Sequence, residues 1–197
     1  MAASTGRVRV AILISGGGSN MAALIDAAAQ PDAPHQIVLV VSNDPEAGGL
    51  AMARSRGITA IAIDHRPFGK DRAAHEAAIQ AELEAHAVQV IALAGYMRVL
   101  TPWLVGRWAG RMLNIHPSLL PKHPGLDTHA RALAAGDTEA GCTIHIVTDG
   151  VDEGPILAQS AVPIVPGDTS ASLARRVLQA EHALYPRALA EFCRSLD

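Results

Sequence analysis

The feature of this sequence that most limits its fold is a regular alternation between short apolar runs and segments with helical spacing. The first run, Val8–Ile14, is rich in β-branched residues and ends at a glycine cluster, which is typical of a strand buried on both faces of a parallel sheet. Similar apolar runs predict further strands at 37–41, 58–63, 88–94 and 112–115. Helices are predicted from Asn20 to before Pro31, from the Asn43-Asp44-Pro45 turn to about Arg54, over 70–86, and after Pro102. This order predicts a doubly wound α/β fold, an open, mostly parallel sheet with helices on both faces.

The alternation ends after His116, where a proline-rich loop covers 117–125 and precedes a short helix. Two later runs, 142–147 and 156–162, are expected to pair antiparallel. A last helix is expected from about 171 to 192, capped by the Asp168-Thr169-Ser170 segment, with Pro186 disturbing its final turns. We expect a single domain over 1–197 with a loose terminus at 1–6.

Composition narrows the classes of protein. The chain of 197 residues is 49% hydrophobic and 18% charged, with a net charge of −3, which indicates a cored globular protein without a nucleic-acid surface. The apolar run Val8–Ile14 is too short to span a membrane, so a cytosolic location is expected. Cys142 and Cys193 lack the spacing of a zinc site or a disulfide framework, and no metal is expected.

The glycine cluster Gly16–Gly18, followed by Ser19 and Asn20, joins the first strand to the first helix. Backbone amides at such a helix start can approach a phosphate closely. No Lys-Ser or Lys-Thr follows, so this is no P-loop, and Met21 stands where a dinucleotide fingerprint has its third glycine. Phosphate binding and a tight turn without a ligand both remain open.

Asn114 and His116 flank Ile115, so in a strand their side chains point the same way. An amide donor can stabilise the oxyanion formed when an amine attacks a carbonyl, and histidine can pass the proton that the amine loses. Asp152 follows a predicted strand in a loop rich in glycine and acids, where it could orient His116. The alternatives are a structural histidine and a solvated turn.

These motifs together resemble the folate-dependent glycinamide ribonucleotide transformylase family, nearly from end to end. The segments that carry the resemblance are Ser15–Asn20, Ala94–Arg98, Asn114–Pro121, Pro124-Gly125 with Thr128-His129, Val147–Asp149 leading to Asp152 and Gly154-Pro155, and Glu181-His182 with Tyr185-Pro186. The run Asn-Ile-His-Pro-Ser-Leu-Leu-Pro at 114–121 is the most specific of them.

The resemblance implies formyl transfer from the co-substrate 10-formyltetrahydrofolate to the amine of 5'-phosphoribosylglycinamide, in a monomer or homodimer that binds small molecules only. It implies a catalytic trio of Asn114, His116 and Asp152. The ribotide would be held by Gly18, Ser19, Asn20 and Glu181. The folate would be held by Arg72, Met97, Arg98, Val99, Leu100, Asn114, Thr148, Asp149, Gly150, Val151 and Asp152. The chain would then divide into a phosphate-binding half, 7–115, and a half with the catalytic loop and folate site, 116–197.

Three residues depart from the commonest family pattern: Gly17 stands in place of asparagine, His123 of tyrosine and Asp127 of histidine. Two other interpretations compete. A methionyl-tRNA formyltransferase or formyl-folate hydrolase would share the trio, but each is expected to carry an additional domain that this length does not accommodate. A non-catalytic dinucleotide module would use the glycine cluster and Asp44, but it gives no role to Asn114 and His116.

Overall fold

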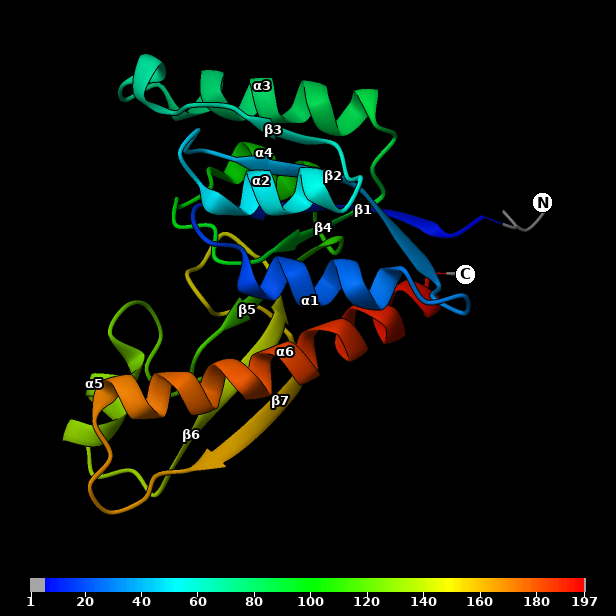
Figure 1. Cartoon of the computed structure of the whole chain (residues 1–197). Coiled ribbons are helices and arrows are strands. Elements are labelled where there is room, and N and C mark those ends of the chain that lie inside the picture. The colour runs from blue at the N-terminus through cyan, green and yellow to red at the C-terminus, as the bar shows by residue number, and fades with distance from the viewer. Residues whose placement is uncertain (1–5, 197) are drawn as a thin grey trace.

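The computed structural model describes residues 6–196 and has a single mixed sheet at its centre (Figure 1). Its seven strands are β1 (Val8–Ile14), β2 (His35–Ser42), β3 (Ala60–Ala62), β4 (Val90–Leu93), β5 (Met112–His116), β6 (Glu139–Ile146) and β7 (Ile156–Pro163). Strands β1 to β5 run parallel to one another, β6 is antiparallel to β5, and β7 is antiparallel to β6. Both the α/β class and the antiparallel pair predicted from the sequence are confirmed.

The strand order β3-β2-β1-β4-β5-β6-β7 reverses beside β1. From β1 the chain moves outward through β2 and β3, then returns to place β4 on the other side of β1. Ligands of open parallel sheets bind at such a reversal, beyond the carboxyl ends of the strands. The glycine cluster follows β1 and segment 94–101 follows β4, so both lie at this reversal.

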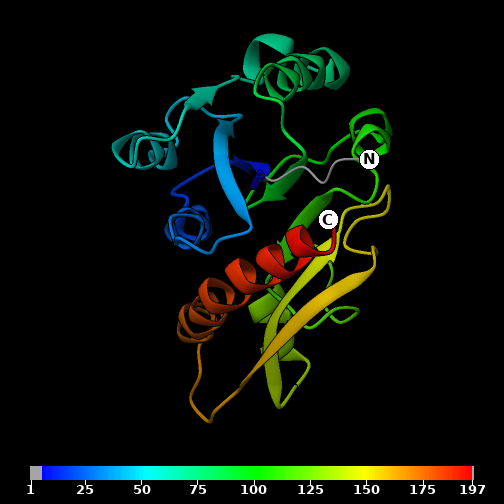
Figure 2. The same cartoon turned by 90° about the vertical axis from the view of Figure 1, so that its right-hand side faces the viewer.

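Helices cover both faces of the sheet, as Figure 2 shows in a view turned by 90°. They are α1 (Ser19–Ala28), α2 (Gly48–Ser55), the short 3-10 helix η1 (Arg66–Phe68), α3 (Arg72–Ala85), α4 (Pro102–Arg107), α5 (Thr128–Ala134) and α6 (Ser170–Arg194). Buried residues of α1, α2, α5 and α6 form one core, and those of α3 and α4 form the other. Alternate residues of β1 serve the two cores, Ile12 in the first and Leu13 in the second, which explains its unbroken apolar run.

Helix α6 is fastened to the centre of the sheet by Tyr185. Its hydroxyl is fully buried and lies 3.1 Å from the carbonyl oxygen of Leu93 on β4 and 3.2 Å from that of Leu113 on β5. A buried hydroxyl needs such a partner. Glu181 lies one turn earlier on the same helix, so this contact also fixes where Glu181 lies along the strands.

Two helix boundaries differ from the prediction. Helix α2 begins at Gly48, after the Asn43-Asp44-Pro45 segment, because the Ser42 hydroxyl accepts from the Asp44 N–H and Asp44 accepts from the Glu46 N–H, which forms a turn instead of a cap. Helix α6 continues through Pro186 to Arg194, since buried residues on both sides of the proline, Leu184 and Leu189 among them, keep it packed. Its predicted cap is confirmed: Thr169 and Ser172 form a capping box.

The predicted loose terminus falls mostly on residues 1–5, which lie outside the described residues. Within residues 6–196, no helix combines the length and the apolar character needed to cross a bilayer.

A buried histidine gives the fold a sensitivity to acid. His35, at the start of β2, is 1% exposed, and neither ring nitrogen has a hydrogen-bond partner among the described residues. Burial, and then the charges of Arg7 and Arg194, lower its pKa from 6.5 to about 4. Between these two pH values His35 is protonated in the unfolded chain but not in the folded chain. The free energy of unfolding therefore falls as the pH drops from 6.5 to about 4.

We predict that His35→Leu removes this loss, which amounts to about 3 kcal/mol. Tm measured across this pH window should fall less steeply in the variant than in the wild type. His86→Leu, at the partly exposed C-terminal cap of α3, is the matched control and should keep the wild-type slope. Equal slopes for the wild type and His35→Leu would show that His35 is not the titrating group.

Candidate active site

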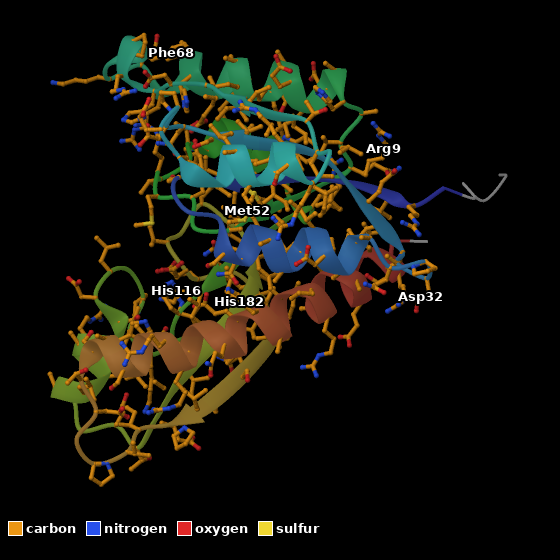
Figure 3. All side chains as sticks on the ribbon, in the orientation of Figure 1. Arg9, Asp32, Met52, Phe68, His116 and His182 are labelled. Carbon is orange, nitrogen blue, oxygen red and sulfur yellow. The ribbon has the colours of Figure 1, made fainter. Side chains whose placement is uncertain are left out.

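His116, the last residue of β5, pairs with Asp152 from the loop between β6 and β7. Its Nδ1 lies 3.2 Å from Asp152 Oδ2, and both side chains are nearly buried. In Figure 3, where His116 is labelled, it lies at the boundary between the parallel part of the molecule and the part formed by α5, α6, β6 and β7. The structure thus brings together two members of the expected trio from distant parts of the chain.

Asn114, the third member, is connected to the His116–Asp152 pair by His145, which lies close to both Asn114 and Asp152. Asn114 on β5 is paired in register with His145 on β6, and Asn114 Nδ2 lies 3.1 Å from His145 Nε2. The same nitrogen of His145 lies 3.6 Å from Asp152 Oδ1. Asn114, His116, His145 and Asp152 therefore form one polar group on one face of the sheet.

Backbone groups of loop 117–127 complete this arrangement. The carbonyl oxygen of His123 lies 3.0 Å from His116 Nε2, and the N–H of Gly125 donates to Asp152 Oδ2 at 2.9 Å. Asp152 holds a left-handed backbone conformation, φ 56°, which aspartate tolerates better than most residues. The loop thus contacts His116 through its second ring nitrogen and Asp152 through the same oxygen that faces His116.

The surroundings of Asp152 favour its ionised form. Burial raises the pKa of the carboxyl group, but His145, the Gly125 N–H and the nearby His116 together outweigh burial, so the pKa lies below its usual value. Both ring nitrogens of His116 face oxygen acceptors, and only a protonated ring donates from both nitrogens. The arrangement brings an imidazole, an amide and a carboxylate together, the kinds of group that stabilise an oxyanion and transfer a proton.

The glycine cluster is shaped by close packing as well as by its position at a helix start. Gly18 precedes α1 with φ 74°, and a Cβ there would lie 2.9 Å from Met21 Cε and 3.1 Å from Gly49 Cα. Only glycine meets both conditions. Ser19 is exposed at the first turn of α1, so the backbone amides of this turn are open to an anion.

Asn20 and Glu181 meet beside this turn. Asn20 Nδ2 donates to Glu181 Oε2 at 2.6 Å, between α1 and α6. Burial raises the pKa of Glu181, and the Asn20 bond only partly offsets it. Asn20 Oδ1 is buried without a hydrogen-bond partner among the described residues. A buried acceptor beside a carboxylate suits a ligand that carries hydroxyl groups.

The residues expected to contact folate form two segments on either side of β5. Met97, Arg98, Val99 and Leu100 follow β4, and Thr148–Val151 follow β6 and lead into Asp152. Met97 is 67% exposed, Val99 62% and Val151 56%, so apolar surface is available to a flat ring. Arg72, at the start of α3, donates to the Val99 carbonyl at 3.4 Å.

Comparison with known proteins identifies the family. The model of the formyl transferase family matches residues 8–189. The chain belongs to the formyl transferase family. It is 43% identical over 185 residues to the phosphoribosylglycinamide formyltransferase of Escherichia coli strain K12, a match that covers 94% of this chain and 87% of that protein.

Other members of the family differ in length. The chain is 50% identical to part of the trifunctional purine biosynthetic protein adenosine-3 of Drosophila melanogaster; the match covers 93% of this chain but only 14% of that protein. The crystal structure of phosphoribosylglycinamide formyltransferase from Brucella melitensis superposes with a TM-score of 0.91 at 55% identity and covers 95% of this chain and 96% of that one.

The three departures from the family pattern have different surroundings in this formyl transferase. A Cβ on Gly17 would meet no atom within 4 Å, so the site has room for a side chain. His123 Nε2 lies 2.8 Å from Asp137 Oδ2, which ties its loop to the start of β6. Asp127 is exposed before α5 with φ 57°. The Leu120-Pro121 peptide bond in the same loop is cis.

Reasoning from the sequence missed His145 and the two backbone partners from the 117–127 loop. Strand alternation places His145 on a known face only once the register of β6 on β5 is known, and nothing in the sequence states that register. Among residues 6–196, no group of three or more histidine, cysteine, aspartate or glutamate side chains could hold a metal ion.

We predict that Glu181→Gln stabilises this protein. The raised pKa means that folding disfavours the carboxylate, so Glu181 costs stability above about pH 4.5 and less as the pH falls. The amide that replaces the carboxylate keeps an acceptor for Asn20. At neutral pH, Tm should rise by about 2–4 °C, equivalent to about 1 kcal/mol in a chain of this size.

The resemblance implies that Glu181 binds 5'-phosphoribosylglycinamide. On that expectation the same variant should raise the KM for this ribotide by about tenfold, since an amide accepts hydrogen bonds from hydroxyl groups less strongly than a carboxylate. Glu191→Gln, exposed on the same helix, should change neither Tm nor KM. A lower Tm in Glu181→Gln at neutral pH would contradict the account of its burial.

Proposed function

We propose that this chain transfers the formyl group of 10-formyltetrahydrofolate to the amine of 5'-phosphoribosylglycinamide, a step in de novo purine (IMP) biosynthesis. The single observation that carries the proposal is the meeting of Asn114, His116 and Asp152 within one polar group beside the carboxyl ends of β4 and β5. Relatives named for this activity over nearly the whole chain support it.

In the proposed reaction, the amine nitrogen of the ribotide attacks the formyl carbon and forms a new C–N bond. The formyl oxygen becomes an oxyanion, which accepts hydrogen bonds from the Asn114 amide and a ring N–H of His116, in place of the contacts that these groups make with His145 and the His123 carbonyl. The attacking nitrogen loses a proton toward Asp152, whose lowered pKa keeps it ionised. When the bond to N10 of the folate breaks, its electron pair stays on N10, which takes up a proton.

The ribotide would lie along the glycine cluster. Backbone amides at Gly18, Ser19 and Asn20 supply donors for the phosphate at the positive end of α1. Asn20 and Glu181 supply buried acceptors for ribose hydroxyl groups. This assignment explains why the chain keeps an acid at a position where burial disfavours its charge.

The folate would lie between the segments that follow β4 and β6. Met97, Val99 and Val151 offer apolar surface. The same two segments also contain Leu100, Thr148, Asp149 and Gly150. Arg72 and Arg98 supply the cations that a glutamate tail needs. Asn114 and Asp152 adjoin both this space and the reacting carbon.

The proposal also includes a cytoplasmic location and a monomeric or homodimeric state, with small molecules as the only partners. The purine pathway named for the relatives supports the first of these. The net charge of −3 supports the exclusion of nucleic acid.

The direct test is formyl transfer from 10-formyltetrahydrofolate to 5'-phosphoribosylglycinamide, followed by absorbance as the folate loses its formyl group. Purified wild-type protein should turn over only when both substrates are present. Release of formate in the absence of the ribotide would favour a formyl-folate hydrolase instead.

We predict that His116→Ala and Asp152→Asn each lower kcat by roughly 100-fold or more, because each removes a group that acts on the reacting atoms. Their Tm values should stay near that of the wild type. His86→Ala, at the far end of α3, is the matched histidine control and should keep full activity. Near-normal turnover in either site variant would refute the assigned roles.

A further inference from the structure

The segment that joins β4 to α4 is anchored at both ends by side chains from other parts of the fold. This segment, residues 95–101, contains four of the residues assigned above to folate binding. Ser15, after β1, holds its first part, and Glu76, in α3, holds its last residue. Neither side chain has a role in the reaction proposed above.

Ser15 joins three strand ends through one hydroxyl group. Its Oγ accepts from the Met97 N–H at 2.8 Å and donates to Asn43 Oδ1 at 2.5 Å. Asn43 follows β2, and its Nδ2 in turn lies 3.2 Å from His65 Nδ1, after β3. A hydroxyl that accepts and donates at once is fixed in its rotation, so the position of Met97 depends on the ends of β1 and β2.

Glu76 is a buried acid whose two carboxylate oxygens both accept from the same residue, Thr101. It is 2% exposed, and its carboxylate accepts from the Thr101 N–H at 2.8 Å and from the Thr101 hydroxyl through its other oxygen. Thr101 is the residue before α4. A buried carboxylate is tolerated only when such donors compensate its loss of water. The contact between Glu76 and Thr101 therefore holds Thr101 in one position.

The glycine cluster is held by backbone hydrogen bonds that do not involve the Ser15 hydroxyl group. The Gly49 N–H donates to the Gly16 carbonyl at 3.1 Å, and the Ala22 N–H donates to the Gly18 carbonyl at 2.9 Å. The Ser15 N–H also donates to the Gly95 carbonyl at 3.1 Å, through backbone atoms that a side-chain change leaves in place. Loss of the Ser15 hydroxyl therefore acts on Met97 and its neighbours more than on the phosphate cradle.

We propose that Ser15 and Glu76 are positioning residues that set the affinity for the folate co-substrate, by fixing the two ends of the segment that carries Met97, Arg98, Val99 and Leu100. This inference rests on the proposed function. It assigns no contact between either side chain and the reacting atoms, so its signature is a selective change in folate affinity.

The test measures kcat and both KM values for Ser15→Ala and Glu76→Gln. Ser15→Ala leaves the Met97 N–H without its acceptor, and Glu76→Gln replaces two hydrogen bonds to a carboxylate by weaker ones to a neutral amide. Each is a change of about 1–2 kcal/mol, which corresponds to roughly a 5- to 30-fold rise in the KM for 10-formyltetrahydrofolate. The KM for the ribotide and kcat at saturating folate should stay within about twofold of the wild type.

Matched changes separate positioning from general damage. Ser55→Ala, at the end of α2, and Glu84→Gln, exposed on α3, should leave every constant unchanged. Ser15→Thr keeps a hydroxyl and should restore most of the folate affinity. If Glu76→Gln does not fold, Thr101→Val removes one of the two donors to Glu76 and should raise the folate KM by a smaller factor.

Equal rises in both KM values, a fall in kcat alone, or an unchanged folate KM in Ser15→Ala would overturn the inference. These outcomes, observed with an active wild type, leave the proposed function intact. A wild type that transfers no formyl group would instead refute the proposed function, and this inference with it.

Discussion

The antiparallel pairing of β6 with β5 is the constraint on which the site depends. It places His145 opposite Asn114 and returns the chain so that Asp152 reaches His116. Because the two strands are antiparallel, β6 ends beside Leu113, and the loop after it folds back so that Asp152 lies 3.2 Å from His116. The reversal of strand order beside β1 adds the second requirement, because it brings the glycine cluster and the segment after β4 to the same edge of the sheet.

Buried acids distinguish the surroundings of this site from the rest of the core. Asp152, Glu181 and Glu76 are all acids withdrawn from water, but their surroundings differ. Hydrogen bonds outweigh burial at Asp152, whereas burial prevails at Glu181, which has one donor. Acids held in such contrasting surroundings are typical of sites where binding or proton transfer requires them. His35 lies apart from the site, and nothing in the structure explains why a histidine stands there.

The sequence was a good guide wherever the signal was local. The apolar run Val8–Ile14, the glycine turn and the Thr169 cap all follow from residues near one another in the chain, and the structure confirms each of them. Strand alternation also placed Asn114 and His116 on one face. Helix α2 was placed too early because the polar residues before it form a turn whose hydrogen bonds compete with a helix cap.

The rest depended on contacts between distant segments, which local patterns do not report. The register of β5 on β6 brought in His145, and the fold of the 117–127 loop placed the His123 carbonyl and the Gly125 N–H on the two partners. The same holds for Ser15 and Glu76, whose side chains look ordinary in the sequence. Their partners, Met97 and Thr101, are identified only by the packing of β1 and α3 against the segment after β4.

The central claim, that His116 and Asp152 act as one unit, is tested most directly by a double-mutant cycle on the rate of a single turnover. His116→Ala, Asp152→Asn and the double variant would be compared with the wild type at saturating concentrations of both substrates. If the two residues act together, the double variant should be about as slow as the slower single variant. Losses that multiply in the double variant would show that the two side chains act independently and would contradict the account.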